Sequence, residues 1–408
     1  MRILIVSQYF WPENFRINDL AVELINRNHD VTILTGLPNY PSGNIYNNFL
    51  ADPNRYSNFN GAKVFRVPML PRGKGKPQLI LNYLSFAISA SIFGIWKLRR
   101  KNFDVIFTFQ TSPITVGIPA VILRFFKQAP LVFWVLDLWP ESIKAAGGIH
   151  SKWILAMVGR LVSFIYKHCD LILVQSKSFI PEVFKYSLNK NNIKYFPSWS
   201  DNPISKKKVV FAKEIKKKPN TFNVMFAGNL GDAQDFPAIL NAMEILKSNT
   251  RVRWLIVGDG RMKSWITKEI SKRNLQKNIF LLGSYPVSRM PSFYKHADAL
   301  LVSLKDEFIF SLTIPGKIQS YLASGKPILG MLNGAGAEII RDAEAGFTCP
   351  AGESDNLAKI VLKMCSLSNK ERLELGKNGI VFGESEFNRD ILIDKLEFFF
   401  DNVALKNF

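Results

Sequence analysis

The sequence predicts an α/β protein made of two doubly wound, Rossmann-like domains that face a central cleft. Three observations support this fold class. The chain has 408 residues, enough for two domains of about 100–200 residues each. Its apolar runs are short and continuous and alternate with helical patterns, as expected for parallel strands covered on both faces. A lysine-rich stretch around Lys206–Lys208 and Lys213–Lys218 interrupts this scheme, which then repeats.

The expected strands define the domains. In the first half they are Ile3–Val6, Val31–Leu34, Val105–Phe109, Leu131–Val135 and Leu171–Val174. In the second half they are Val224–Ala227, Trp254–Val257, Ile279–Leu282, Ala299–Val302, Ile328–Gly330 and Gly346–Cys349. We expect an N-terminal domain over residues 1–203, a C-terminal domain over 204–386, and a final segment, 387–408, that packs back on the N-terminal domain. Ligands of such folds bind at the carboxyl ends of the strands.

Composition indicates a globular protein of a reducing compartment. Apolar residues make up 47% of the chain, which argues against disorder. Cys169, Cys349 and Cys365 are few and lack metal-ligand spacing, as is typical of incidental thiols. The apolar start reaches Glu13 before a signal peptide could be completed, so we interpret it as a first strand and expect a cytoplasmic protein.

The net charge of +20 is concentrated around one apolar stretch. Between Asp52 and Asp104 the chain has no acid, and basic residues flank the run Leu79–Trp96. This run suits three structures: a core helix, a membrane-spanning helix, or a helix lying in the interface of an anionic membrane. The basic flanks and the aromatic residues near both ends favour the interfacial helix, with residues 72–101 as the membrane-binding zone. Because the bases surround an apolar stretch, we do not expect a nucleic acid partner.

Two stretches of the second half suit an anionic ligand. Gly228-Asn229-Leu230 follows an apolar run and precedes a helical pattern, so backbone N–H groups there could face an anion, although an ordinary strand–helix joint has the same pattern. Lys317 lies at a predicted helix start, where a cation opposes the helix dipole and calls for a negative partner; the alternative is a solvated surface lysine. Asp259 and Lys263 in the turn after the next strand give a weaker signal of the same kind.

Two stretches of the first half carry carboxylates. Asp137 and Glu141, with Trp139 between them, follow a buried run, so a carboxylate there could orient or deprotonate a hydroxyl; Asp137 alone would more often be a helix cap. Glu13 follows a proline turn, near Arg16, and either caps the following helix or faces the cleft.

Motifs along nearly the whole chain resemble the family 4 glycosyltransferases of the two-Rossmann (GT-B) class. They are Tyr9–Glu13, Pro38–Gly43, Asp137–Glu141, Phe226–Leu230, Val257–Gly260, Leu282-Gly283, Met290–Tyr294, Ala297–Ala299 and Ser324–Pro327. Within the family, the chain is similar to bacterial enzymes of surface polysaccharide synthesis, in particular the fucosamine transferases of O-antigen and capsule synthesis.

This resemblance implies a nucleotide-sugar donor in the C-terminal domain, an acceptor in the N-terminal domain and retention of anomeric configuration. The implied donor-binding residues are Gly228, Asn229, Leu230, Asp259, Lys263, Ser284, Tyr285, Ser311, Leu312, Thr313, Lys317 and Ser320. The implied catalytic residues are Asp137, Glu141 and Glu13, and the implied acceptor-binding residues are Asn14, Arg16 and Trp139. The chain has no Asp-x-Asp motif, so we expect no metal and no cofactor besides the UDP-sugar substrate.

Three departures from the family pattern affect these expectations. Two glutamates common in the family, eight positions apart, are replaced by Leu312 and Ser320, which suggests a sugar with fewer hydroxyls, such as a deoxy-amino sugar. A glycine pair after Glu13 is replaced by Asn14-Phe15, and a lysine after the Gly-Asn-Leu turn appears as Gln234 or is displaced.

Together these features predict a glycosyltransferase peripheral to the cytoplasmic membrane. It would move a deoxy-N-acetylhexosamine such as fucosamine from a UDP-sugar to a polyprenyl-diphosphate-linked acceptor. A nucleotide-sugar 2-epimerase of the same fold is the alternative, and would act on the nucleotide sugar alone. A non-catalytic protein that docks on a membrane or nucleic acid is the third hypothesis, and would tolerate loss of Asp137 and Lys317.

Overall fold

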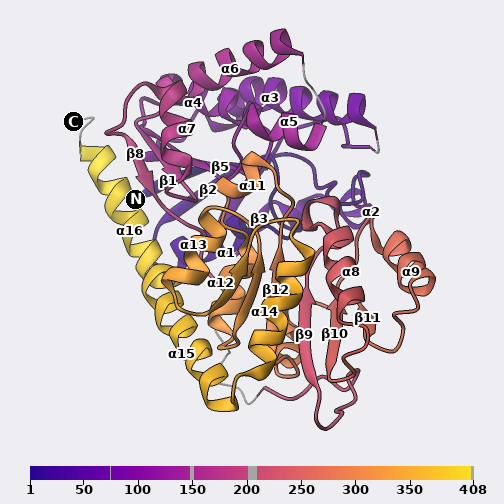
Figure 1. The fold of residues 1–408 in the computed structure, drawn as a ribbon. Helices are drawn as coiled ribbons and strands as arrows, with labels where there is room; N and C mark the ends of the chain where they lie inside the picture. The colour runs from indigo at the N-terminus through magenta and orange to yellow at the C-terminus, as the bar shows by residue number, and fades with distance from the viewer. Residues whose placement is uncertain (74, 148–150, 201–208, 406–408) are drawn as a thin grey trace. The chain divides into compact units, whose positions relative to one another are not determined.

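The computed structural model describes residues 1–73, 75–147, 151–200 and 209–405. Contacts divide the chain into two compact units (Figure 1): unit 1 is Met1–Pro197 with Asp390–Phe408, and unit 2 is Ser198–Arg389. The predicted boundary at residues 203 and 204 lies outside the described residues, as do Lys206–Lys208 and Lys74 of the basic zone.

Unit 1 contains an eight-stranded sheet in its described residues. Its strands are β1 (Arg2–Val6), β2 (Asp30–Thr35), β3 (Asn58–Phe59), β4 (Ala62–Arg66), β5 (Val105–Gln110), β6 (Leu131–Val135), β7 (Leu171–Val174) and β8 (Ile193–Tyr195). The strand order is β3-β4-β2-β1-β5-β6-β7-β8, and every pair is parallel except β3 with β4. The order reverses between β1 and β5, so the crevice outside their carboxyl ends is the expected ligand position.

The helices of unit 1 lie between these strands and at the end of the chain. They are α1 (Arg16–Asn26), α2 (Asn47–Ala51), α3 (Lys76–Leu98), α4 (Gly117–Lys127), α5 (Glu141–Gly147), α6 (Lys152–Lys167), α7 (Phe179–Ser187) and α16 (Arg389–Leu405). Helices α3, α4, α6 and α7 pack in this order, each on the next, and form a layer along one side of the sheet (Figure 1).

Helix α3 is long and apolar but only partly buried. Its 23 residues are sufficient in length and hydropathy to cross a membrane, and a third of its most apolar window is buried. One face, with Phe86, Ala90 and Gly94, packs toward β2 and α4. The other face exposes a stripe of large side chains, Ile80, Leu84, Ile88, Ile92 and Trp96, spaced four residues apart.

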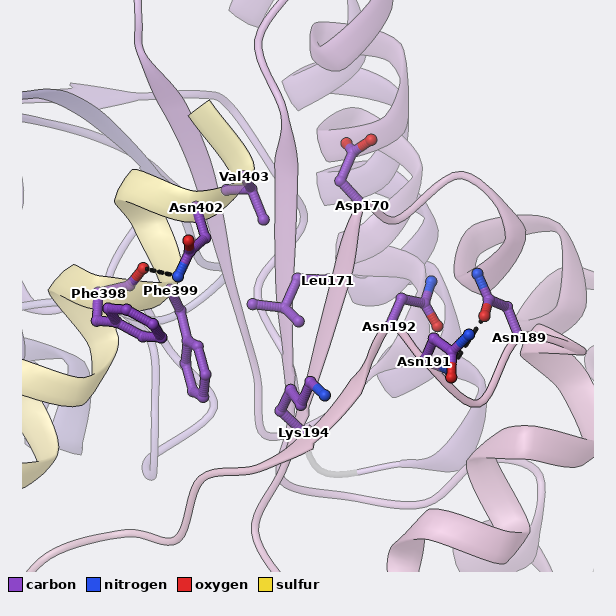
Figure 2. A pocket seen from close by; sticks show the side chains of 10 residues that line it. All are labelled: Asp170, Leu171, Asn189, Asn191, Asn192, Lys194, Phe398, Phe399, Asn402 and Val403. Carbon is purple, nitrogen blue, oxygen red and sulfur yellow. Dashed lines mark hydrogen bonds between the residues drawn. The ribbon is translucent and has the colours of Figure 1, made fainter. Parts of the chain in front are cut away.

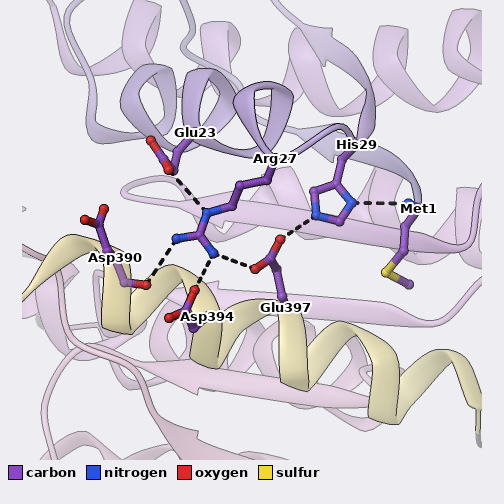
Figure 3. A network of polar contacts seen from close by, with 7 residues as sticks. All are labelled: Met1, Glu23, Arg27, His29, Asp390, Asp394 and Glu397. Carbon is purple, nitrogen blue, oxygen red and sulfur yellow. Dashed lines mark hydrogen bonds and ion pairs between the residues drawn. The ribbon is translucent and has the colours of Figure 1, made fainter.

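The last helix, α16, joins unit 1 through polar and apolar contacts (Figure 3). Arg27, at the end of α1, contacts the carboxylates of Asp394 and Glu397, and His29 lies 2.7 Å from Glu397. Phe400 packs edge-on against Phe107 of β5, with ring centroids 5.6 Å apart. The final segment of the chain therefore completes the first unit.

The described part of unit 2 forms a six-stranded, wholly parallel sheet. Its strands are β9 (Phe222–Ala227), β10 (Val252–Val257), β11 (Ile279–Gly283), β12 (Ala299–Ser303), β13 (Ile328–Met331) and β14 (Gly346–Cys349). Its helices are α8 (Phe236–Ile245), α9 (Lys263–Lys272), α10 (Met290–Tyr294), α11 (Phe308–Leu312), α12 (Gly316–Ala323), α13 (Ala335–Asp342), α14 (Ser354–Ser366) and α15 (Asn369–Glu386). The order β11-β10-β9-β12-β13-β14 reverses between β9 and β12.

The predicted fold class of two Rossmann-like units is confirmed. Every strand expected from an apolar run is present, and the buried runs form the centre of each sheet. The sequence missed β3, β4 and β8, which lie at the edges of the first sheet.

Candidate functional site

The carboxyl edge of the unit 2 sheet holds a buried, unpaired ammonium group. Lys317 is the second residue of α12, and its Nζ is buried without a hydrogen-bond partner among the described residues. Nζ lies 3.6 Å from the centroid of the Phe226 ring, the last aromatic residue of β9. Burial lowers the pKa of Lys317 to about 7. A buried cation without a counter-charge is costly, so this position suits an anionic ligand.

Glycines make room for this lysine at the end of β9. Gly228 has φ +140°, and a Cβ there would lie 2.6 Å from Cε of Lys317. Gly258, at the end of β10, has φ +146°, and a Cβ there would lie 1.8 Å from the carbonyl oxygen of Gly228. Side chains at either position would separate the two strand ends or displace Lys317. The glycines therefore let a ligand approach the backbone closely.

Other predicted donor-binding residues lie around this edge. Leu230 N donates to the Asp259 carbonyl at 2.8 Å, which joins the turns after β9 and β10. The side chain of Asn229 lies close to Gly231 and Gly260. The backbone of Ser311 lies against Gly334, where a Cβ would approach the Ser311 carbonyl oxygen to 2.0 Å. These contacts connect Gly228, Asn229, Leu230, Asp259 and Lys317 into one cluster.

Several predicted donor-binding side chains have partners within their own segment. Lys263 pairs with Asp259 at 2.8 Å on the surface. The hydroxyls of Ser311, Thr313 and Ser320 donate to backbone carbonyls three or four residues earlier. These hydroxyl protons are occupied within their own segments, as is common for Ser and Thr in helices, and the donor-binding roles of these residues stay a prediction.

Ser284, Tyr285 and Leu312 are placed by the ends of β11 and α11. Ser284 and Tyr285 follow β11, where the Tyr285 ring packs on Phe293 with centroids 4.6 Å apart. Leu312 is the last residue of α11 and is half-buried. The described contacts do not bring the Tyr285 side chain to Lys317, so its position near a base stays a prediction.

In unit 1, Asp137 lies just past the carboxyl end of β6, held by neutral donors. Its carboxylate accepts hydrogen bonds from Trp139 Nε1, at 3.0 Å, and from the Ser142 hydroxyl. Burial raises the pKa of Asp137 above its ordinary value, and the hydrogen bonds from Ser142, Trp139 and Ser112 oppose this shift. A shielded carboxylate of this kind is a reasonable proton acceptor.

Glu141 and Trp139 lie beside Asp137. Glu141 begins α5, and its Oε1 accepts a hydrogen bond from Tyr186 OH at 3.4 Å, whereas its Oε2 is buried and without a partner in the described part of the chain. Burial raises the pKa of Glu141. The Trp139 ring packs edge-on against Tyr83 of α3, with centroids 6.4 Å apart. The predicted carboxylates and indole thus belong to one region.

Glu13 binds backbone groups with both carboxylate oxygens, which supports a positioning role, and the catalytic role expected for it stays a prediction. Its side chain is 1% exposed. Oε1 accepts hydrogen bonds from the backbone N–H groups of Asn39, at 2.8 Å, and Tyr40, at 2.7 Å, and Oε2 accepts one from Phe10 at 3.2 Å. Burial raises its pKa, and these three bonds act against the shift. Because both oxygens bind backbone, Glu13 holds the 38–43 loop in place.

The predicted acceptor residues Asn14 and Arg16 lie at the start of α1, next to Glu13. Asn14 is exposed. Arg16 forms an ion pair with Asp19 at 3.1 Å, one turn along α1. Among the described residues, neither contacts Asp137, so their role in acceptor binding stays a prediction.

Several residues at the carboxyl edges of the two sheets were not predicted from the sequence. Phe226 supports Lys317, and Ser142 binds Asp137. Gln8 lies two residues after β1, and Gln110 is the last residue of β5. Both have buried side-chain atoms without a partner in the described residues. A glutamine at the end of an otherwise apolar run was the available signal, because an amide buried there needs partners. Ser142 gave no signal beyond its place beside Glu141.

Two hollows lie away from these residues, at the amino edges of the sheets. The hollow in unit 1 has a volume of about 370 Å³ (Figure 2) and is lined by Asp170, Leu171, Asn189, Asn191, Asn192, Lys194, Phe398, Phe399, Asn402 and Val403. The hollow in unit 2, about 430 Å³, includes Lys216, Lys217, Lys218, Lys295 and Lys326 in its lining. None of the predicted site residues lines either. Within the described residues, no group of three His, Cys, Asp or Glu side chains is placed to hold a metal.

Comparison with known proteins identifies relatives over nearly the whole chain. A family model described as "Glycosyl transferase 4-like domain" matches residues 14–199, and one described as "Glycosyl transferases group 1" matches residues 207–382. The glycosyltransferase named WbjE of Pseudomonas aeruginosa is 26% identical over 303 residues, 72% of this chain and 74% of that protein. WcaI of Escherichia coli K12, named for a glycosyl transferase of colanic acid biosynthesis, is 24% identical over 344 residues, 80% of this chain and 82% of that protein.

The fold also matches solved structures. The crystal structure of Anabaena HepE in complex with UDP superposes with a TM-score of 0.70 at 14% identity, and the match covers 98% of this chain and 100% of that chain. At this identity the likeness shows a shared fold.

Proposed function

Because this chain belongs to the family 4 glycosyltransferases with the GT-B fold, we propose that it transfers a sugar from a UDP-sugar to a lipid-diphosphate-linked glycan in surface polysaccharide synthesis. The transferred sugar is a deoxy-N-acetylhexosamine such as fucosamine, and transfer retains the anomeric configuration. The colanic acid relative supports a polysaccharide product, and the HepE complex supports UDP as the nucleotide.

The observation that carries this proposal is the unpaired ammonium of Lys317 beside Gly228. The diphosphate of UDP-sugar supplies the missing negative charge, and the start of α12 adds the positive end of a helix dipole. Negative charge grows on the diphosphate as the sugar departs. A fixed cation in a shielded position therefore stabilises the transition state more than the bound substrate.

The residues near the ends of α11 and α12 support a sugar with few hydroxyl contacts. Leu312 and Ser320 stand where carboxylates are common in the family, and Ser320 donates its hydroxyl proton within α12. A buried carboxylate favours a sugar whose hydroxyl donates a hydrogen bond to it. An apolar side chain such as Leu312 accepts a sugar that lacks a hydroxyl at that position. This is the basis for proposing a deoxy-amino sugar.

Asp137 is the proposed partner of the acceptor hydroxyl. Its raised pKa keeps proton affinity higher than that of an exposed aspartate, and its bonds to Ser142 and Trp139 hold the carboxylate in one orientation. In this proposal Asp137 orients the hydroxyl and accepts its proton. Glu141 and Trp139 shape the same region.

The outer surface of the helical layer supports binding at the cytoplasmic face of the inner membrane. Besides the stripe on α3, large apolar side chains are exposed on α4, α6 and α7, namely Phe125, Phe126, Trp153, Met157, Phe164 and Phe184. Lys97, Arg99, Arg100 and Lys101 follow the α3 stripe. An apolar face beside basic residues suits an anionic bilayer, where a lipid-linked acceptor resides.

Thermal unfolding with UDP, GDP, ADP or CMP, without added metal, tests the donor site. A ligand at 100 times its Kd stabilises the folded protein by about 2.7 kcal/mol, so UDP is expected to raise Tm, and Lys317→Ala to abolish the shift. Lys359→Ala, on the exposed side of α14, is the matched control. Absence of a shift with every nucleotide would contradict the proposal. Conversion of UDP-N-acetylglucosamine without acceptor would instead indicate the 2-epimerase.

A further inference from the structure

The carboxyl edge of unit 1 holds a guanidinium group for which the described residues supply no carboxylate partner. Arg72 lies in the loop between β4 and α3, and its Nη1 donates to Tyr9 OH at 3.0 Å. Its Cζ lies 5.3 Å from the centroid of the Tyr40 ring. Burial acts to lower the pKa of Arg72, but the phenols of Tyr9, Tyr83 and Tyr40 raise it above the ordinary value. The group is therefore cationic, half-buried and surrounded by neutral aromatic residues in the described structure.

Hydrogen bonds hold the backbone of the Arg72 loop in a fixed place. The buried carboxylate of Glu13 accepts the Asn39 N–H at 2.8 Å, and Asn39 Oδ1 accepts the Arg72 N–H at 3.1 Å. Gly73 N donates to the Gly43 carbonyl at 2.9 Å, which joins the same two loops again. The backbone of Arg72 is thus linked through Asn39 to the buried carboxylate of Glu13. Its guanidinium, which donates to Tyr9, remains available to bind a ligand. Such preorganisation reduces the entropy lost on ligand binding.

Unsatisfied buried amides lie at the same edge. Gln8 Nε2 donates to Asn82 Oδ1 at 2.8 Å, and Asn82 Nδ2 donates to the Leu70 carbonyl at 2.6 Å, so this chain of bonds reaches the Arg72 loop. Gln8 Oε1 and both polar atoms of the Gln110 side chain are buried without a partner in the described residues. Both glutamines stand at the point where the strand order reverses, the expected ligand position of this fold. Because Gln8 is 2% exposed and Gln110 0% exposed, they are not themselves ligand contacts, but they make the interior behind the Arg72 loop polar.

We propose that Arg72 binds the diphosphate group of the lipid-linked acceptor. This assignment rests on the proposed function, because it concerns the acceptor of that reaction. A guanidinium presents parallel N–H donors that match phosphate oxygens, which an ammonium does not. Helix α3 begins four residues after Arg72 and carries the exposed apolar stripe along its length. The lipid chain then lies along the membrane side of α3, while its diphosphate is held at the edge of the sheet where Asp137 is located.

Direct binding of a short polyprenyl diphosphate tests this assignment. We would titrate farnesyl diphosphate into the full-length protein by calorimetry, with saturating UDP so that the donor site of unit 2 is filled. Arg72→Gln is expected to weaken binding about 10- to 100-fold, the usual effect of losing a charge-assisted hydrogen bond. Arg72→Lys keeps the charge and is expected to recover only part of the affinity. Arg55→Gln, an exposed arginine of unit 1 outside the 72–101 zone, is the control and is expected to change affinity less than twofold.

Two further probes identify what Arg72 recognises. Farnesol, which lacks the diphosphate, is expected to bind the parent protein and Arg72→Gln equally weakly. Inorganic diphosphate is expected to bind more weakly than farnesyl diphosphate; equal binding would mean a free anion site and would overturn the lipid part of the proposal. Tyr9→Phe, which removes the phenol that holds Arg72, provides a second variant and is expected to weaken farnesyl diphosphate binding about threefold to tenfold.

The outcome separates this inference from the proposed function. If UDP binds but Arg72→Gln leaves the affinity for farnesyl diphosphate within twofold, the acceptor assignment is wrong and the donor proposal stands. An equal loss in Arg55→Gln would also overturn it, since it would indicate general surface attraction. If UDP does not bind at all, the donor proposal fails, whereas the farnesyl diphosphate titration still tests Arg72.

Discussion

Arg27 and Glu397 form an ion pair with Nη1 and Oε2 2.7 Å apart, which joins the first helix of the chain to its last (Figure 3). The same guanidinium also contacts Glu23 and Asp394. The Arg27 side chain is 23% exposed, so this network is shielded more than an ordinary surface pair. It is therefore expected to stabilise the attachment of α16 to unit 1.

Arg27→Ala is expected to lower the free energy of unfolding by about 1–2 kcal/mol, because it leaves three carboxylates without their shared partner. Urea unfolding measures the effect. Lys377→Ala, which removes a surface pair with an N–O distance of 4.0 Å, is the control and is expected to change stability by less than about 0.5 kcal/mol. Equal effects of the two substitutions would show that the α16 network contributes nothing special.

UDP binding is expected to depend on pH through Lys317. Its pKa is lowered to about 7 in the ligand-free protein, against about 10.4 for an exposed lysine. Between these values the unfolded chain holds the additional proton, so this group makes stability rise with pH. A bound diphosphate favours the ammonium, so UDP affinity is expected to fall above pH 7, by at most about tenfold per pH unit. Calorimetry in buffers of different ionisation enthalpy measures the proton uptake.

The matched variants for this pH dependence are Lys317→Met and Lys317→Arg. Lys317→Met removes the buried charge, so it is expected to raise Tm without ligand at pH 7 and to weaken UDP binding at every pH. Lys317→Arg keeps a charge that does not titrate below pH 10. A pH dependence in Lys317→Met equal to that of the parent chain would assign the proton to another group.

Protonation of Asp137 is expected to cause the loss of transfer activity at low pH, the acid limb of the pH–activity profile. Because burial raises its pKa, activity should fall, as pH decreases, at a pH above the ordinary aspartate value of about 3.9. Ser142→Ala removes a hydrogen bond that opposes this shift, so it should move the acid limb to higher pH. Asp137→Asn should lower kcat about 10²- to 10⁴-fold while leaving UDP affinity unchanged. An unaltered acid limb in Ser142→Ala would contradict the assignment.

Glu13→Gln distinguishes positioning from catalysis. The amide keeps one acceptor oxygen but places an NH2 group against backbone N–H donors, which should lower the free energy of unfolding by about 1–3 kcal/mol. At a temperature where the variant is fully folded, kcat should remain within a few-fold of the parent value. A loss of kcat as large as that of Asp137→Asn, in a folded protein, would support the catalytic role.

Membrane binding should depend on the helical layer of unit 1. Ile88 and Ile92 on α3 and Trp153 on α6 are each at least 60% exposed. Ile88→Glu, Ile92→Glu and Trp153→Glu are each expected to reduce sedimentation with vesicles of anionic lipid by several-fold, without a change in Tm. Val381→Glu on α15, an equally exposed apolar residue of unit 2, is the control. If only the α3 variants matter, the membrane surface is restricted to the zone that the sequence indicates.

Strands were predictable where burial on both faces produces continuous apolar runs, such as Leu131–Val135. The segment Ala62–Arg66 escaped prediction because Lys63 and Arg66, on opposite faces of the strand, interrupt its apolar pattern. It lies second from the edge of the sheet, between β2 and the two-residue β3. The strand β8 was missed for a similar reason, because Lys194 is the middle residue of its three and leaves no apolar run.

The candidate site was predictable in part. The conflict between Lys317 and the helix dipole was visible in the sequence, whereas its ring partner Phe226 lies 91 residues earlier and is found only through the fold. The sequence shows the charge of Glu13 but not its partners, which are backbone groups of residues 39 and 40 in another loop. In the sequence, Arg72 is only the first residue of the basic zone 72–101, because its phenol partner Tyr9 belongs to another loop.

The return of α16 to unit 1 has a consequence for biosynthesis. The strands of the first sheet leave the ribosome before the roughly 190 residues of unit 2, at about 5–20 residues per second. For tens of seconds the surface around Phe107 and Arg27 therefore lacks its covering helix. During this interval the nascent first unit depends on a chaperone or on the stability that it has without α16. If translation stops within unit 2, the chain that is released lacks α16, so its first unit cannot be completed.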